Sequence, residues 1–250
     1  MLNAQRFDVH RPGLLVHGFG FAGAGAGALK PLLAHLPIGL GLAEFVMPGR
    51  GRRVRETPVT QLDRLCQQAS EALAETDQPL ILLGYSLGAL LAFETAHLLQ
   101  SAGRPPAALV VCALNAPQHL AAGGEVHRLP LPALRDHLAA LGGTPDVVLR
   151  DLDVLACFAP GIRADYELIE TYRYVPRERL RCPIVTLAGT RDALTGMDEV
   201  HAWSALTTQH CTTLWVDDTH FFLDRHTDRW HRAFQMAASA ANASTLFHTT

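Results

Sequence analysis

Short apolar runs alternate along this chain with longer segments in which apolar residues recur at helical spacing. Strands are expected at residues 13–17, 43–47, 80–84, 108–114, 184–188 and 212–216. Helices are expected between them at residues 28–36, 62–75, 89–102 and 199–206. Strands and helices that alternate in this way favour an α/β fold, with a mostly parallel central sheet flanked by helices on both faces.

One long stretch, residues 117–181, breaks this alternation. It contains helical patterns separated by Gly142-Gly143-Thr144-Pro145 and by Pro160-Gly161, and no strong strand. An insertion of this size between two strands predicts a helical lid over one end of the sheet. We therefore expect a single domain of 250 residues, with a core at about 1–116 and 182–238 and the lid at about 117–181. The Ala/Ser/Thr-rich residues 239–250 are expected to form a flexible tail.

The pentapeptide Gly84-Tyr85-Ser86-Leu87-Gly88 carries the pattern G-x-S-x-G. It follows the apolar run 80–83 and precedes the apolar helical run 89–93, which is the strand–turn–helix context of a nucleophile elbow. The tight turn forces the serine into strained backbone angles, and glycine on both sides removes bulk that would clash. We expect Ser86 to be a nucleophile, and the backbone N–H of Leu87 to be one donor of an oxyanion hole.

A serine hydroxyl needs a base, and in folds with this elbow an acid and then a histidine follow the serine along the chain. Asp192 comes just after the predicted strand 184–188, and His220 follows the last strand. Both would lie at the carboxyl ends of strands, where the sites of open parallel sheets gather. His220 is the predicted base and Asp192 the predicted acid. The other candidates near these positions are Asp198, Asp217 and Asp218, with the non-acidic Asn115 at a further position.

A glycine-rich stretch, residues 17–27, contains the pattern G-x-G-x-x-G after the first predicted strand. A dinucleotide-binding loop would need an acidic residue about 20 residues on, at the end of the next strand. That predicted strand, 43–47, ends in Met47-Pro48-Gly49, and Glu44 lies near its start. We interpret the glycines instead as a loop that passes close to the elbow and supplies the second oxyanion donor.

The composition narrows the function classes further. Apolar residues make up 48% of the chain and the net charge is -3, so no basic surplus indicates nucleic acid. Five dispersed cysteines and an N-terminus without a signal-peptide core favour a cytoplasmic protein. No H-E-x-x-H or similar ligand cluster occurs, so no metal is expected. The most apolar run, 80–99, contains the elbow and is not expected to span a membrane.

Together these motifs resemble the type II thioesterases of polyketide and nonribosomal peptide synthesis, within the α/β-hydrolases. The resemblance covers roughly residues 13 to 235. It is carried by Pro48-Gly49-Arg50-Gly51, GYSLGALLAFE at 84–94, Leu141-Gly142-Gly143-Thr144-Pro145, Ala164-Asp165-Tyr166, Glu170-Thr171-Tyr172-Arg173-Tyr174 and His220-Phe221-Phe222-Leu223.

This resemblance implies a substrate that composition could not indicate. The substrate would be an acyl thioester on the phosphopantetheine arm of an acyl or peptidyl carrier protein, and the task would be to free carriers blocked by wrong or stalled acyl groups. The insertion would be the lid that shapes the acyl pocket, and Asp192 would be the acid of the triad. The enzyme would need no cofactor of its own, and we expect it to be a monomer.

The sequence departs from the family pattern at the elbow and in the first loop. Tyr85 and Leu87 stand where the family usually has His and Met, and HGFG replaces P-H-A-G-G. If the strand ends are aligned, Phe19 is the second oxyanion donor, whereas a gapless alignment makes it Ala22. We favour Phe19, because 14–17 is the better predicted strand.

Residues that contact the substrate or the carrier are predicted from the same resemblance. Tyr85, Arg50 and Phe221 are the candidates. Arg50 also begins a basic cluster with Arg52, Arg53 and Arg55, which is either a solvated loop or a contact for an acidic carrier or a phosphate.

Three alternative functions remain at this point. A general carboxylesterase or an acyl-CoA thioesterase would use the same triad. A nicotinamide-dependent oxidoreductase would rest on the glycine-rich stretch, and a non-catalytic binding module would be at odds with an intact triad.

Overall fold

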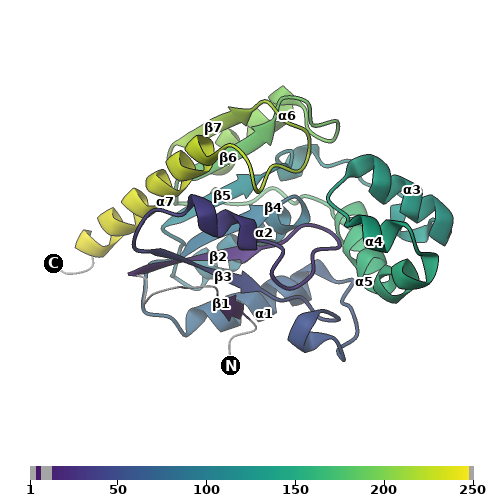
Figure 1. Ribbon diagram of the computed structural model, residues 1–250. Coiled ribbons are helices and arrows are strands. Elements are labelled where there is room, and N and C mark those ends of the chain that lie inside the picture. The colour runs from purple at the N-terminus through teal and green to yellow at the C-terminus, as the bar shows by residue number, and fades with distance from the viewer. Residues whose placement is uncertain (1–3, 7–12, 248–250) are drawn as a thin grey trace.

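Seven strands form one sheet in the part of the chain that the computed structural model describes, residues 4–6 and 13–247 (Figure 1). Their order across the sheet is β1-β3-β2-β4-β5-β6-β7, with β1 antiparallel to β3 and all other pairs parallel. The strands are β1 (Ala4–Arg6), β2 (Leu14–Phe19), β3 (Leu40–Phe45), β4 (Ile81–Tyr85), β5 (Ala108–Cys112), β6 (Ile184–Gly189) and β7 (Cys211–Val216). The predicted mostly parallel α/β sheet is therefore confirmed.

Two strand boundaries differ from the predictions in a way that affects the site. β2 continues past His17 to Phe19, because Phe19 pairs with Phe45 of β3 on one side and with Gly84 of β4 on the other. β3 begins at Leu40, directly after a turn at Gly39 with a φ of 88°, and ends at Phe45. Glu44 thus lies near the carboxyl end of its strand, and the prediction that it lies near the start is wrong.

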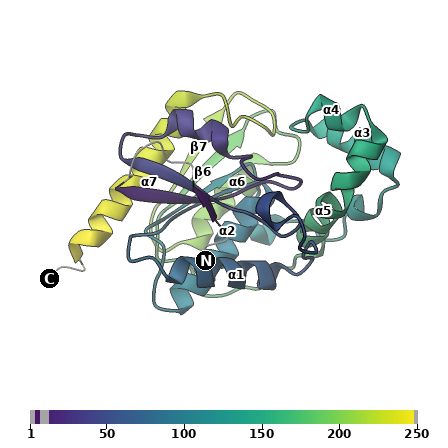
Figure 2. The same ribbon diagram turned by 60° about the horizontal axis from the view of Figure 1, so that its bottom comes forward.

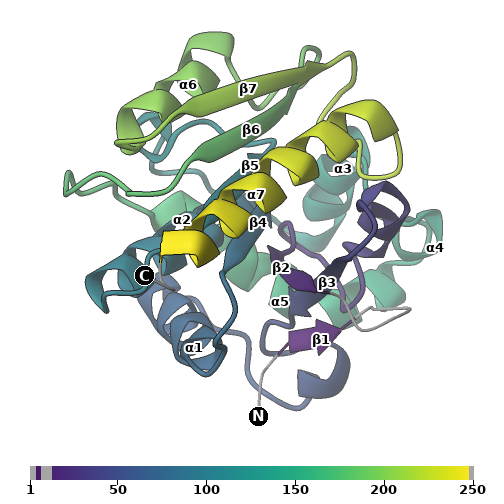
Figure 3. The ribbon, with the colours of Figure 1, turned by 90° about the vertical axis from the view of Figure 1, so that its left-hand side faces the viewer.

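Helices cover both faces of the sheet (Figure 3). The residues of α1 (Leu62–Ala74), α2 (Leu87–Ser101) and the short helix η5 (Ala202–Leu206), which follows α6 (Met197–His201), contribute to the core on one face. Those of η1 (Lys30–His35) and α7 (Thr227–Phe247) contribute to the core on the other. The core on each face contains a fully buried tryptophan, Trp203 on the first face and Trp230 on the second.

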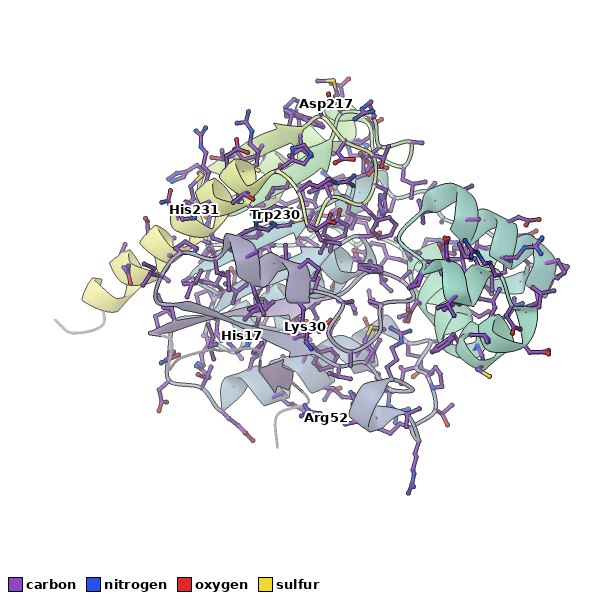
Figure 4. All side chains as sticks on the ribbon, in the orientation of Figure 1. His17, Lys30, Arg52, Asp217, Trp230 and His231 are labelled. Carbon is purple, nitrogen blue, oxygen red and sulfur yellow. The ribbon has the colours of Figure 1, made fainter. Side chains whose placement is uncertain are left out.

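The long helix α7 corrects the expectation of a flexible tail from residue 239. The helix continues to Phe247, and residues 248–250 lie outside the described residues. Small residues explain why the Ala-rich segment stays on the sheet, since the exposed fractions of Ala237 and Ala241 are only 1% and 0%. Figure 4 shows Trp230 on the side of α7 that faces the sheet, with His231 further out.

The apolar run at 80–99 forms β4, a sharp turn and α2, as expected. Almost every side chain of α2 is buried, because the helix is packed between the sheet, α1 and the inserted segment. No helix in the described ranges 4–6 and 13–247 is long and apolar enough to cross a membrane.

The insertion between β5 and β6 is helical, as predicted. It contains η3 (Pro117–His119), η4 (Val126–Arg128), α3 (Leu131–Leu141), α4 (Asp146–Leu149) and α5 (Leu152–Thr171). Figure 2 shows α3, α4 and α5 grouped at one side of the sheet. The group has a small core of its own, formed by Leu134, Leu138, Leu155, Ala159 and Ile162.

Candidate active site

Ser86 lies in the turn between β4 and α2, with a φ of 53° and a ψ of -121°. This left-handed conformation is strained for a residue with a side chain, and glycines on either side make the turn possible. A Cβ on Gly84 would lie 2.1 Å from the carbonyl oxygen of Gly88, and one on Gly88 would lie 2.0 Å from that of Phe19. The elbow therefore requires glycine at both positions, as the motif predicts.

The structure brings Ser86, His220 and Asp192 together from three separate loops. The Nε2 atom of His220 is 3.0 Å from the Oγ of Ser86, and its Nδ1 is 2.8 Å from the Oδ2 of Asp192. Asp192 also accepts a hydrogen bond of 2.9 Å from the N–H of Leu194, which fixes its carboxylate. The histidine and the aspartate are both buried, so this chain of hydrogen bonds is shielded from water.

The competing acidic residues all lie elsewhere. Asp217 pairs with Arg191 at the upper edge of the molecule (Figure 4), and Asp218 pairs with His226 and Arg225. Asp198 is exposed at the start of α6. Asn115 accepts a hydrogen bond of 3.0 Å from the N–H of Gly196 and so supports the loop that carries Asp192.

Tyr85 differs from its predicted role as a substrate or carrier contact. Its exposed fraction is 0%, because the ring lies among the rings of Phe222, Phe221 and Trp230. The hydroxyl donates a hydrogen bond of 2.6 Å to the carbonyl of His220 and accepts one of 3.0 Å from the N–H of Phe222. Burial raises the pKa of Tyr85 well above its usual value, which keeps the hydroxyl protonated as a donor. Tyr85 thus anchors the histidine loop from inside.

Removal of this hydroxyl in Tyr85→Phe is expected to lower the free energy of unfolding by about 1–3 kcal/mol, because a buried carbonyl and a buried N–H lose their partner. The looser histidine loop should also lower kcat. Denaturant unfolding and thioester hydrolysis measure the two effects. Tyr166→Phe is the matched control, since that hydroxyl bonds His137 inside the insertion at 3.1 Å, and it should leave kcat unchanged. An unaltered kcat in Tyr85→Phe would contradict the anchoring role.

The preference for Phe19 as the second oxyanion donor rested on a strand that ends at His17, and that premise is wrong. Phe19 is the last paired residue of β2, and the loop begins after it. The carbonyl of Phe21 accepts a hydrogen bond of 2.9 Å from the N–H of Ala24, so residues 21–24 form a turn beside the elbow. Ala22, the alternative from the gapless alignment, lies at the first central position of this turn.

The glycine-rich loop binds a carboxylate of the protein itself rather than an open phosphate site. Glu44 is buried below the loop and accepts hydrogen bonds from the backbone of Gly27, at 2.6 Å, and of Ala28 and Leu29. Burial raises the pKa of Glu44 to about 7, although these N–H groups oppose the shift. The acidic partner of a ribose is therefore occupied in holding the loop, which argues against a dinucleotide site.

The basic cluster divides into buried and exposed members. Arg50 is mostly buried and forms an ion pair with Asp165 of α5, so it is not a free carrier contact. Arg53, in η2 (Gly51–Arg53), is buried as well and donates to the carbonyl of Val46 at 2.9 Å. Arg52 and Arg55 are the exposed members, and Figure 4 shows Arg52 at the lower edge of the molecule.

Phe221 is half-buried between the catalytic loop and the insertion. Its ring lies 5.0 Å from the ring of His220 and 4.9 Å from that of Phe21. Gly143 of the insertion approaches so closely that a Cβ there would lie 2.6 Å from the ring. Phe221 therefore lies between the catalytic histidine and the insertion, and its contact with substrate stays a prediction.

The described residues contain no group of three or more histidine, cysteine or acidic side chains that could hold a metal ion. The five cysteines are free thiols, and four of them are at least partly buried.

Comparison with known proteins identifies the family. A model of the thioesterase domain matches residues 16–236. The chain belongs to the thioesterase family. GrsT, a gramicidin S biosynthesis protein of Aneurinibacillus migulanus, is 34% identical over 209 residues, covering 81% of this chain and 80% of GrsT.

Solved structures agree with this family. BorB, a type II thioesterase from the borrelidin biosynthetic cluster, matches with a TM-score of 0.84 and 33% identity, covering 95% of this chain and 97% of BorB. RedJ, a thioesterase of the prodiginine pathway in Streptomyces coelicolor, matches with a TM-score of 0.81 and 30% identity, covering 91% and 85%. The fold is thus the predicted α/β-hydrolase fold, and the protein is a type II thioesterase of the polyketide and nonribosomal peptide class. An oxidoreductase and a non-catalytic module are thereby set aside.

Two functional features of the site were not predicted. The anchoring role of the Tyr85 hydroxyl depends on a loop 135 residues away in sequence, and no local pattern indicates it. In the sequence, Asp165 stands out only as part of the motif Ala164-Asp165-Tyr166. The structure places its carboxylate against the glycine-rich loop.

Proposed function

We propose that this thioesterase hydrolyses acyl thioesters through a covalent intermediate on Ser86, with His220 as general base and acid and Asp192 as its orienting carboxylate. The observation that carries this proposal is the continuous contact from the serine Oγ through the imidazole to a buried carboxylate, at 3.0 Å and 2.8 Å. The strained turn that presents the serine and the start of α2 directly behind it support the same assignment.

In the first half of the reaction, the Oγ of Ser86 attacks the thioester carbonyl while the Nε2 of His220 takes the hydroxyl proton. The negative oxygen of the tetrahedral intermediate is stabilised by the backbone N–H of Leu87 and by that of Ala22. When the C–S bond breaks, the departing sulfur takes the proton from the imidazolium. Asp192 stabilises the charged imidazole and holds the tautomer with a proton on Nδ1.

In the second half, water replaces the thiol. His220 takes a proton from the water as its oxygen attacks the acyl-Ser86 ester, and the same two N–H groups stabilise the second oxyanion. Collapse of this intermediate returns the proton to the Oγ of Ser86 and releases the carboxylic acid.

We infer that the thiol is the phosphopantetheine arm of an acyl or peptidyl carrier protein. GrsT is a gramicidin S biosynthesis protein and BorB comes from a borrelidin cluster, so relatives that cover most of this chain belong to pathways of carrier-bound intermediates. The inferred task is to release wrong or stalled acyl groups from such carriers. The exposed Arg52 and Arg55 would meet acidic groups of the carrier or the phosphate of its arm.

The double variant Arg52→Glu/Arg55→Glu tests the carrier contact. We expect kcat/KM for an acyl-carrier substrate to fall about tenfold, since two favourable charges become unfavourable and slow the encounter. The same acyl group on N-acetylcysteamine should be hydrolysed at the wild-type rate. Initial rates are measured on both substrates at low and high salt. The decrease in kcat/KM for the acyl-carrier substrate should be smaller at high salt, because salt screens the charges.

A matched control reverses the charge of two arginines of the insertion, the exposed Arg128 and the partly exposed Arg135. Equal losses on carrier and N-acetylcysteamine substrates, or none on either, would contradict the carrier contact. A general carboxylesterase would instead hydrolyse the matched oxygen ester as fast as the carrier thioester. That outcome would overturn the proposed substrate while leaving the triad in place.

A further inference from the structure

The insertion contacts the rest of the domain, here called the body, at the turn Phe21–Ala24. This turn carries the proposed second oxyanion donor and is called the oxyanion turn below. Asp165 of α5 has an exposed side-chain fraction of 1%, and its Oδ2 accepts a hydrogen bond of 2.7 Å from the N–H of Gly23. The same oxygen pairs with the guanidinium of Arg50, which also donates to the carbonyl of Gly161 in α5 at 3.0 Å. A buried carboxylate thus joins three segments: the helix of the insertion, the loop after β2 and the loop after β3.

The geometry of the turn explains why this contact matters. In the turn Phe21–Ala24, Gly23 occupies the second central position with a φ of 79°, while Ala22 has no positive φ. This combination defines a type II turn. Types I and II differ by a flip of the central peptide, which here is the bond between Ala22 and Gly23. The carboxylate of Asp165 holds the N–H of that peptide and so selects one of the two orientations.

The neighbouring peptide, between Phe21 and Ala22, carries the N–H assigned above to the oxyanion hole. Gly20, the residue directly before the turn, lies against the elbow, because a Cβ on Gly88 would be 2.6 Å from the carbonyl oxygen of Gly20. Ile162, one turn before Asp165, also packs on the loop and would lie 3.4 Å from a Cβ on Gly23. A rotation of the central peptide would therefore disturb the adjacent donor.

We propose that Asp165, in helix α5 of the insertion, is a positioning residue that fixes the orientation of the oxyanion turn. Stabilisation of the transition state then depends on the packing of α5 against the body. Arg50 serves this arrangement by neutralising the buried carboxylate and by joining it to the loop after β3. The proposal rests on the roles given above to Ser86 and Ala22. It predicts a defect in transition-state binding, whereas a merely structural ion pair would affect stability alone.

The test measures kinetics and inhibitor binding for Asp165→Ala and Asp165→Asn. The substrate is an acyl-N-acetylcysteamine thioester, and the inhibitor is a trifluoromethyl ketone with the same acyl chain, whose adduct with the serine carries an oxyanion. In Asp165→Ala, kcat should fall about 10- to 100-fold, somewhat less than when an oxyanion donor is removed outright. The Ki of the ketone should rise by the same factor, with KM unchanged. Asp165→Asn should lie between this variant and the wild type, because its amide oxygen can still accept from Gly23.

Tyr172→Phe is the matched control. The hydroxyl of Tyr172, just after α5, donates to the Oε1 of Glu94 in α2 at 2.8 Å, so its loss weakens another contact between the insertion and the body. It should lower the melting temperature and leave the Ki of the ketone unchanged. A folded Asp165→Ala with an unchanged Ki would overturn the proposal, and so would an equal rise of Ki in Tyr172→Phe. If Asp165→Ala does not fold, an unchanged Ki in Asp165→Asn overturns it.

Failure of the catalytic assignment would show in a different measurement. A ketone that binds Ser86→Ala as tightly as the wild type would place the oxyanion chemistry elsewhere, whatever Asp165 does. A loss confined to acyl-carrier substrates would concern the carrier contact alone, because the substrate and inhibitor used for Asp165 need no carrier.

Discussion

Ser86→Ala is expected to lower kcat for an acyl thioester by at least about 10⁴-fold, because loss of the nucleophile removes the covalent route and leaves only binding and the oxyanion hole. The fold should remain intact, since alanine fits the space of the serine and the strained φ of 53° is set by the turn. Steady-state hydrolysis gives the rate. Mass spectrometry of the quenched protein gives the acyl adduct, which should form on the wild type and be missing from the variant.

The matched control is Ser70→Ala in α1, where the hydroxyl is exposed and donates only to the carbonyl of Gln67 at 2.9 Å. That variant should hydrolyse and acylate like the wild type. Turnover by Ser86→Ala near the wild-type rate, or an acyl adduct on another residue, would contradict the proposed mechanism. If Ser86→Ala fails to unfold cooperatively, the same test is made with Ser86→Gly, which also lacks the hydroxyl and tolerates the positive φ of the turn.

The central parallel strands β4, β5 and β6 could be predicted because they are buried on both faces and appear as nearly continuous apolar runs. Their ends could not, because pairing rather than local composition decides them. Phe19 belongs to β2 since Phe45 and Gly84 lie beside it, and neither pairing is visible near His17 in the sequence. The strand ends only two residues later than predicted, but this difference changes which residue we propose as the second oxyanion donor.

The triad residues could be predicted because each is fixed by its place after a strand and by chain order. Ser86, Asp192 and His220 needed only the G-x-S-x-G motif and the expected order of acid and histidine. The supporting contacts could not be found in this way. Tyr85 supports the histidine loop through a hydroxyl, and Asp165 reaches Gly23 across 142 residues of chain. Such contacts depend on how separate elements pack, and one sequence carries no periodic signal for them.

The glycine-rich stretch shows how one pattern can serve two chemistries. The spacing of its glycines fits a phosphate-binding loop, and the structure even places Glu44 near the end of the following strand. The N–H groups of the loop, however, point to that carboxylate and to Asp165. Internal carboxylates thus satisfy donors that a nucleotide-binding protein would keep for its ligand.

Asp192→Asn is expected to lower kcat by about 10³- to 10⁴-fold, because an amide can hold the imidazole in the wrong tautomer and cannot stabilise its positive charge. In the structure the Oδ2 of Asp192 is 2.8 Å from the Nδ1 of His220, and the Oδ1 is fixed by the N–H of Leu194. Asparagine has the same size and shape as aspartate, so the variant should change the melting temperature little. Pre-steady-state kinetics should show that acyl-enzyme formation and breakdown are both slowed, since the imidazole acts in each.

Asp218→Asn is the control that separates this role from a general effect of a nearby carboxylate. Asp218 precedes His220 by two residues, but its buried carboxylate is directed away from the triad: its Oδ2 is 2.9 Å from the Nε2 of His226 and pairs with the exposed Arg225. Its loss should lower stability, because a buried carboxylate and its two partners lose their pairing, and should leave kcat within about twofold, because Asp218 does not bond His220. If Asp218→Asn were the slower variant, or if Asp192→Asn retained most of its activity, the acid of the triad would be misassigned. The geometry requires a large decrease of kcat in Asp192→Asn and a nearly unchanged kcat in Asp218→Asn.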